Sequence, residues 1–149
     1  MKNRSVPTDS VLPHVHYRDV VEAGQWLARV FGFTEDYRYG DPISGVQMHL
    51  GGAYLNLHTL PSACKTAAEL GFGTQMLTIF LPDVDAHFVR AKEQGAVFFE
   101  EPHQTVYGER QYGVFDLDGH RWLFSKHVQD LDPRDWGATV AEPLRSGEV

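Results

Sequence analysis

Histidines and other polar side chains recur at every second position of two segments that resemble β-strands. His14 and His16 are two residues apart in one segment, and Tyr54, Asn56 and His58 alternate with leucines in the other. Because successive side chains of a strand point to opposite faces, each set shares one face of its strand. Imidazole binds metals and exchanges protons near neutral pH. The pattern therefore predicts a polar sheet face suited to metal binding, acid–base chemistry or hydrogen bonding.

Two later segments show the same alternation with a different chemistry. Leu77 and Ile79 form an apolar set in the first, and Trp122 and Phe124 do so in the second. The residues that alternate with them are Met76, Thr78, Phe80, Arg121, Leu123 and Ser125. Sites for medium-sized organic ligands combine apolar walls with a few polar groups. We therefore expect the apolar sets to lie under helices and the mixed sets to line a ligand cavity.

The remaining candidate groups carry weaker signals. Arg121 suits either an anionic ligand group or a surface carboxylate, and Cys64 has no neighbours that would activate a thiolate. His120 follows an Asp-Gly turn, which it is expected to shape. His87, in a helical stretch, and His103, in a loop, are both expected to face solvent. None of these residues is predicted to act as a catalytic group.

The chain repeats its own pattern, which indicates how these side chains are positioned. A strand-like segment at 11–17 enters a helical stretch at Asp19, and a second one at 75–81 enters another at Asp83. Each copy ends in a strand that leaves a glycine-containing turn. A repeat of this length indicates two similar supersecondary modules that share one sheet system. Equivalent strand positions of the two copies should therefore contribute to a site in equivalent ways.

The organisation predicted from this repeat is a single domain spanning residues 1–149. It comprises a first βαβββ module at 10–62, a linker at 63–72, a second module at 73–127 and a C-terminal tail at 128–149. Apolar residues at helical spacing mark the buried face of the first helix and include Trp26. We expect Trp26 and Trp122 to be buried beneath helices.

Composition excludes several classes of partner. The 149 residues include 13 basic and 20 acidic side chains, giving a formal net charge of −7, which disfavours nucleic acid or an anionic membrane as the ligand. The single cysteine, Cys64, permits no intramolecular disulfide and is typical of a reducing compartment. No apolar run approaches the roughly 20 residues of a membrane span, and the first residues do not resemble a secretory signal. These features predict a cytoplasmic protein.

Residues 10 to 127 resemble the vicinal oxygen chelate superfamily, which includes glyoxalase I, bleomycin-resistance proteins and extradiol dioxygenases. The resemblance rests on Asp19-Val20 and Asp83-Val84 before the helices, Phe31-Gly32-Phe33 after the first helix, and the runs 107–110 and 115–122. It implies an α+β fold of two βαβββ modules, whose curved mixed sheets surround a concave ligand cup. It also implies a homodimer that pairs modules across the subunit boundary, with Tyr107 and Arg110 at the rim of the cup.

The same resemblance allows the metal site to be examined position by position. Metal-dependent members carry ligands at positions that correspond here to Leu12, Asn56, Met76 and Leu123. Divalent cations need imidazole nitrogens or carboxylate oxygens at several of these positions at once. We therefore predict no metal and no other cofactor at this site. A displaced site built from His14, His16 and His58 remains the alternative.

The sequence thus favours a metal-free protein of the bleomycin-resistance type that binds a small organic molecule, such as an aromatic one, by sequestration. The predicted contacts are His14, His16, Tyr54, Asn56, His58, Met76, Thr78, Phe80, Tyr107, Arg110, Arg121, Leu123 and Ser125. The alternative is a lyase, isomerase or dioxygenase that uses a displaced histidine-bound metal or a metal-free acid–base pair. A scaffold without a ligand is the third class, and the polar lining argues against it.

Overall fold

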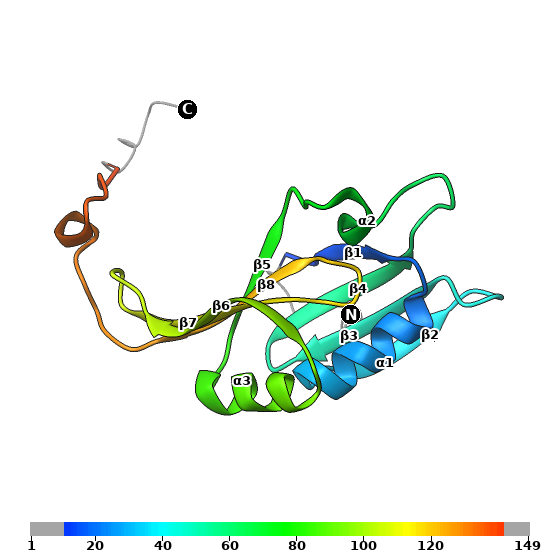
Figure 1. Cartoon of the computed structure of the whole chain (residues 1–149), viewed down its shortest axis with the longest axis horizontal. Coiled ribbons are helices and arrows are strands. Elements are labelled where there is room, and N and C mark those ends of the chain that lie inside the picture. Colours follow the sequence, from blue (N-terminus) through cyan, green and yellow to red (C-terminus); the bar gives the residue numbers. More distant parts are fainter. Residues whose placement is uncertain (1–10, 142–149) are drawn as a thin grey trace, which may run out of the picture.

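Two four-stranded mixed sheets, each with one long helix, form the protein (Figure 1). The computed structural model describes residues 11–141. The elements in chain order are β1 (His14–Tyr17), α1 (Val20–Phe31), β2 (Thr34–Tyr39), β3 (Gly45–Leu50), β4 (Ala53–Thr59), α2 (Ala67–Leu70), β5 (Met76–Phe80), α3 (Val84–Glu93), β6 (Val97–Gln104), β7 (Glu109–Phe115), β8 (Arg121–His127) and a 3₁₀ helix (Pro133–Trp136). The predicted α+β fold with two βαβββ modules is confirmed.

The two sheets have the same topology. The strand order is β1-β4-β3-β2 in the first sheet and β5-β8-β7-β6 in the second. In each sheet the first strand of the module pairs in parallel with the last, and the other pairs are antiparallel. The register places His14 opposite Asn56 and Thr78 opposite Leu123. The repeat in the sequence therefore reflects two copies of one sheet.

Local capping interactions explain where the long helices begin and end. The Asp19 carboxylate accepts hydrogen bonds from the backbone N–H groups of Val21 and Glu22, which would otherwise lack partners at the start of α1. Gly32 ends α1 in the left-handed conformation, with φ of 80°. Asp83 caps α3 by accepting one hydrogen bond, from the backbone N–H of Ala86. Within residues 11–141, none of the helices has the length and apolar character to cross a bilayer.

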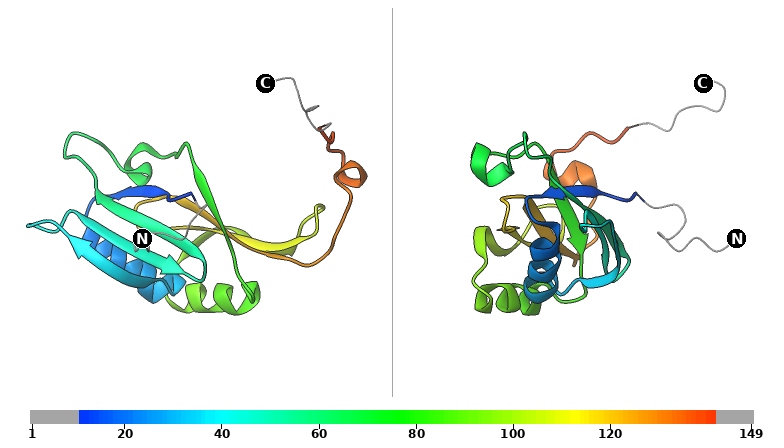
Figure 2. Two further views of the ribbon diagram at one scale, coloured as in Figure 1. Left: turned by 180° about the vertical axis from the view of Figure 1, so that it is seen from behind. Right: turned by 90° about the vertical axis from the view of Figure 1, so that its right-hand side faces the viewer.

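Both sheets bury their apolar faces against one shared layer formed by α1 and α3. The two helices lie side by side in Figures 1 and 2 and contact each other directly. Phe31, at the end of α1, packs edge-on against Trp122 and Phe124 of the second sheet, with ring centroids 5.6 and 4.8 Å apart. Trp122 is fully buried, as predicted, whereas Trp26 is only half-buried against Phe31.

His87 corrects one expectation from the sequence. It does not face solvent: its Nε2 lies 2.7 Å from the carbonyl oxygen of Phe31, and its Nδ1 lies 2.6 Å from the Tyr112 hydroxyl. A carbonyl only accepts, so Nε2 carries the proton and Nδ1 accepts from the tyrosine. Burial lowers the pKa of His87, which favours this neutral form. His87 therefore joins α3 to the end of α1 and to β7.

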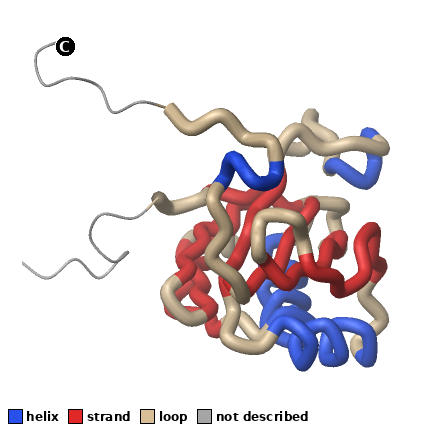
Figure 3. Tube along the Cα trace, turned by 90° about the vertical axis from the view of Figure 1, so that its left-hand side faces the viewer, coloured by secondary structure: helices blue, strands red, loops and turns tan. Residues whose placement is uncertain are grey.

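The faces of the sheets away from this helical layer lie on the outside of the chain. We call them the open faces. Both apolar faces turn inward to the same core. Open-face residues of the two sheets line two smaller cavities, His14 and His16 with Arg121 in one and Tyr54 with Thr78 in the other. Figure 3 shows α1 and α3 together on one side of the strands, with α2 and the 3₁₀ helix on the opposite side.

Candidate functional site

The open face of the first sheet carries the predicted histidine-rich set. His14 and His16 of β1 lie beside Asn56 and His58 of β4, and Tyr54 continues the same row. The imidazoles of His14 and His58 are stacked, with centroids 4.8 Å apart, and His14 Nδ1 lies 2.7 Å from His58 Nε2. The imidazole of His16 also stacks on that of His58, with ring centroids 5.5 Å apart. All five predicted residues of this sheet therefore share one face.

Tyr39 and Gly45 complete this face, and neither was among the predicted site residues. The Tyr39 ring lies across Gly45, where a Cβ would overlap it. This position brings the Tyr39 hydroxyl to 3.3 Å from Asn56 Oδ1 and 3.4 Å from His58 Nδ1. A glycine within a strand often marks such a close approach, and Gly45 is the first residue of β3. Tyr37 and Gln47 add a second pair, 2.6 Å apart, on the same face.

The electrostatics of this face favour a neutral imidazole. Burial lowers the pKa of His58, and the neighbouring His14 and His16 lower it further. One ring of the His14–His58 pair must donate and the other accept, so the two imidazoles share one hydrogen bond. The pair is arranged to hold or pass a proton, or to bind a polar group of a ligand.

The open face of the second sheet is more apolar. Met76 and Phe80 of β5 are 49% and 64% exposed, which is a large apolar surface for a strand to present to water. Thr78 and Leu123 lie opposite each other on the same face. Ser125 is buried there, and its Oγ has no hydrogen-bond partner within residues 11–141. This face therefore presents mainly apolar groups, while the unpaired hydroxyl of Ser125 is buried.

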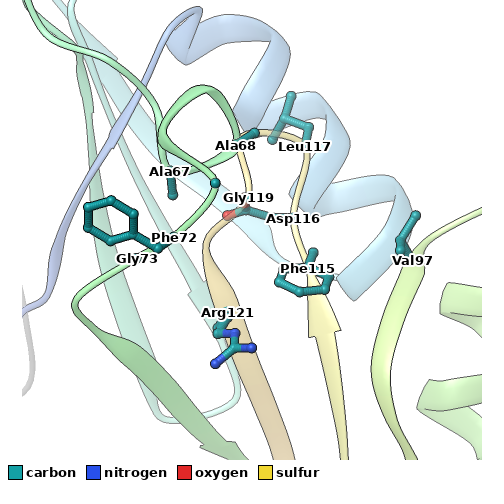
Figure 4. Close-up of a pocket in the computed structure, with 11 residues that line it drawn as sticks. Ala67, Ala68, Phe72, Gly73, Val97, Phe115, Asp116, Leu117, Gly119 and Arg121 are labelled. Carbon is teal, nitrogen blue, oxygen red and sulfur yellow. The ribbon is translucent and has the colours of Figure 1, made fainter.

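Arg121 stands at the edge of a cavity beside α2 (Figure 4). Its guanidinium carbon lies 4.8 Å from the ring centre of Phe99 and 5.6 Å from that of Phe115. The cavity, of about 480 Å³, lies between α2 with its following loop and the ends of β7 and β8. We call it the α2 cavity, and its lining residues are Ala67, Ala68, Gly71, Phe72, Gly73, Val97, Phe115, Asp116, Leu117, Gly119 and Arg121.

Sequence reasoning missed most of this lining. The linker at 63–72 was not expected to contribute to a site, yet Phe72 lies beside the cavity opposite Phe115. The available signal was an aromatic residue held between two glycines, Gly71 and Gly73. Phe99 was missed because the sequence pattern provided no prediction of which sheet face its side chain lies on. It lies across Gly113, just as Tyr39 lies across Gly45.

The two predicted rim residues lie on different faces. The Tyr107 hydroxyl donates to Gln111 Oε1 at 2.9 Å, and Gln111 lies on the open face beside Ser125. Arg110 instead alternates to the helix-covered face and binds Asp85 of α3 with two nitrogens, at 2.6 and 3.2 Å. The structure thus places Tyr107 at the open face of the second sheet and Arg110 away from it.

Comparison with known proteins identifies the family. Residues 12–124 match the family described as the glyoxalase/bleomycin resistance protein/dioxygenase superfamily. The chain belongs to this superfamily. Its crystal-structure relatives include TioX from Micromonospora sp. ML1, with a TM-score of 0.66 and 30% identity over 78% of this chain and 97% of that chain.

Two further relatives of this superfamily member extend the comparison. An uncharacterised protein of Mycobacterium bovis, Mb0911c, is 27% identical over 128 residues, which are 80% of this chain and 84% of its own. The fosfomycin resistance protein FosX from Listeria monocytogenes has a TM-score of 0.61 and 14% identity, over 81% of this chain and 94% of its own. At that identity the likeness to FosX concerns the fold alone.

The side chains of this superfamily member do not fit a divalent metal at the expected positions. Leu12, Met76 and Leu123 offer no nitrogen or oxygen donor, and Asn56 Oδ1 already accepts from Tyr39. Two nitrogens bound to one tetrahedral zinc would be about 3.3 Å apart, whereas those of His14 and His58 lie 2.7 Å apart, as in a hydrogen bond. In the part of the chain from 11 to 141, no three His, Cys, Asp or Glu side chains converge as a metal site.

Proposed function

We propose that this protein binds a small organic molecule without a metal and acts by holding it rather than by transforming it. The observation that carries the proposal is the α2 cavity, of about 480 Å³, which opens onto the face that bears Arg121. This volume lies within the usual range for organic ligands, and the lining combines aromatic walls with a cation. Binding alone requires no catalytic group, so the donor-poor metal positions are compatible with it.

The complete site is proposed to form in a homodimer. In this proposal each open face supplies half of a cup, and the other half comes from the partner protomer. Pairing the first sheet of one protomer with the second sheet of its partner would cover the exposed Met76 and Phe80. It would also bring a histidine-rich wall opposite an aromatic wall. All predicted contacts except Arg110 would then line one cup.

The enzyme alternative rests on one specific observation, the hydrogen-bonded group formed by His14, His58 and Tyr39. His58 has a lowered pKa, so it is available as a base near neutral pH. A metal-free isomerase or lyase would take a proton from the ligand on His14 Nε2, while His14 Nδ1 passes its own proton to His58 Nε2. This candidate requires turnover that is lost in His58→Gln, whereas sequestration requires only binding.

A thermal-shift experiment tests the proposal. The purified chain is heated with a panel of aromatic acids, aromatic amides and aliphatic acids, because binding to the folded state raises the melting temperature. The aromatic compounds should raise it in a concentration-dependent manner, and the ligand should be recovered unchanged. An absence of any shift across the panel would contradict ligand binding. Recovery of a converted product would instead support the enzyme alternative.

A further inference from the structure

The charge of Arg121 is not neutralised within the described chain. Several other arginines pair with a carboxylate within 4 Å, as Arg110 does with Asp85. Across residues 11–141, no aspartate or glutamate lies that close to the guanidinium of Arg121. Its packing over Phe99 and Phe115 holds it at the cavity. A cation fixed on aromatic rings beside a cavity is suited to bind an anionic group of a ligand.

The one carboxylate in the cavity lining, that of Asp116, is already satisfied. It accepts from the Tyr17 hydroxyl at 2.7 Å and from Trp122 Nε1 at 3.0 Å. Its other oxygen accepts from the backbone N–H groups of Asp118 and His120. Asp116 is only 6% exposed. Its charge is therefore directed into the protein, and Arg121 supplies the exposed charge of the lining.

The rest of the α2 cavity is suited to a flat apolar body. Phe72 and Val97 are 64% and 65% exposed there, and each presents an apolar surface that a ligand would cover. Figure 4 shows Phe72 and Phe115 on opposite sides of the group of lining residues, with Arg121 below them in this view. Aromatic rings interact favourably when offset-stacked or edge-to-face, so a phenylalanine on each side favours a planar ring between them.

We propose that the α2 cavity binds a planar aromatic carboxylate, with its ring between Phe72 and Phe115 and its carboxylate on Arg121. This inference rests on the proposed function and names the ligand class and the place where it binds. Arg121 can offer two parallel N–H groups to a carboxylate. A neutral amide of the same shape retains the apolar contacts but loses the charge-assisted hydrogen bonds. Affinity should therefore depend on the charge of the ligand as well as on its ring.

The test uses three probes of nearly equal shape: 2-naphthoate, neutral 2-naphthamide and cationic 2-naphthylmethylamine. Each is titrated calorimetrically into the full chain and into the variants Arg121→Gln and Arg110→Gln. The full chain should bind 2-naphthoate at least about tenfold more tightly than 2-naphthamide, and the amine most weakly. Arg121→Gln should reduce the affinity for 2-naphthoate to that for 2-naphthamide. Arg110→Gln is the matched control because its guanidinium lies on the other face with Asp85, and it should preserve the tenfold preference.

A further variant, Phe115→Leu, tests where the aromatic ring of the ligand binds. Phe115→Leu should weaken all three probes by a similar factor while preserving their order, because it removes aromatic contact without changing charge. Equal binding of 2-naphthoate and 2-naphthamide to the full chain would overturn the anionic class and leave the proposed function standing. An identical loss in Arg110→Gln and Arg121→Gln would overturn the assignment to the α2 cavity. If none of the three probes binds, this inference is wrong, and the thermal-shift panel then decides the proposed function separately.

Discussion

The hydroxyl of Tyr17, in the first strand of the first sheet, donates a hydrogen bond to the carboxylate of Asp116, after the third strand of the second sheet, at 2.7 Å. Both side chains are buried. Tyr17 also lies edge-on to His120, whose Nε2 is 2.8 Å from the backbone carbonyl oxygen of His16. These contacts join residues about 100 positions apart and fix the angle between the two sheets. The position of the α2 cavity relative to the histidine-rich face therefore depends on them.

Replacing Tyr17 with phenylalanine should lower the free energy of unfolding by about 1–3 kcal/mol, because it removes a donor from a buried carboxylate. Chemical denaturation followed by tryptophan fluorescence measures this change. Tyr54→Phe is the matched control, since it removes the same atom from the open face, and it should cost less than about 0.5 kcal/mol. Equal losses in the two variants would show that the Tyr17–Asp116 contact does not join the sheets.

Neutral His87 should contribute a fall in stability as the pH drops from about 7.5 to about 5.5, while His127, whose pKa is raised by hydrogen bonds to Glu109 and Asp130, acts in the opposite direction. Burial lowers the pKa of His87 in the folded protein, so the unfolded chain binds a proton first as the pH falls. The contribution of neutral His87 is complete above its unfolded pKa of about 6.5 and is lost as the pH falls toward the folded value. His58 has a lowered pKa as well and acts in the same direction.

His87→Gln should therefore reduce, without abolishing, the slope of unfolding free energy against pH. Glutamine can still donate to the Phe31 carbonyl and accept from Tyr112, but it does not titrate. His103→Gln, at a position on β6 where the side chain is 43% exposed, serves as the control. A slope that is unchanged in His87→Gln and reduced in His103→Gln would contradict the assignment.

Trp122 and Arg121 are adjacent on β8 and should have separable effects. Trp122→Ala should destabilise the fold by about 3–5 kcal/mol, the usual range for truncation of a buried aromatic side chain. Arg121→Ala should leave stability within about 0.5 kcal/mol and should instead weaken an anionic aromatic ligand by about 1–3 kcal/mol. Denaturation and calorimetry measure the two effects. A reversed result would mean that the faces of β8 are assigned the wrong way round.

Light scattering at micromolar concentrations should give the mass of a dimer. Phe80→Glu should shift the population toward monomer, because it places a charge on the apolar open face that the partner is proposed to cover. Val89→Glu is the matched control: Val89 is 50% exposed on α3, away from that face, and its substitution should leave the mass unchanged. A monomeric wild-type chain would contradict the assembled cup.

Metal content should be low even after exposure to excess metal. After incubation with nickel, zinc, iron or manganese and removal of the excess, mass spectrometry should find less than one bound metal per several chains. The reason is the donor-poor set Leu12, Met76 and Leu123. A stoichiometric metal that is lost in both His14→Ala and His58→Ala would establish the displaced histidine site and support the enzyme alternative.

The sequence by itself determined the parts of the protein that depend on local periodicity. Side chains of a strand alternate between its two faces with a period of two. This alternation placed Asn56 and His58 of β4 on the open face of the first sheet, and Trp122 and Phe124 of β8 on the helix-covered face of the second. The repeated Asp caps and the glycine turns predicted two βαβββ modules in the observed order. The structure and the family comparison confirm this fold.

Only the tertiary structure decided how these parts meet. His87 lies on a short helix that looks solvated in sequence, yet it faces the carbonyl of Phe31 because α3 packs against α1. Phe72 comes from a linker, and its place across the α2 cavity from Phe115 depends on how α2 folds back over the second sheet. Arg110 and Arg121 are both arginines next to strand ends, but a neighbouring Asp85 neutralises only one. Such contacts join residues that are distant in the chain, and local pattern carries no information about which distant surfaces bury each other.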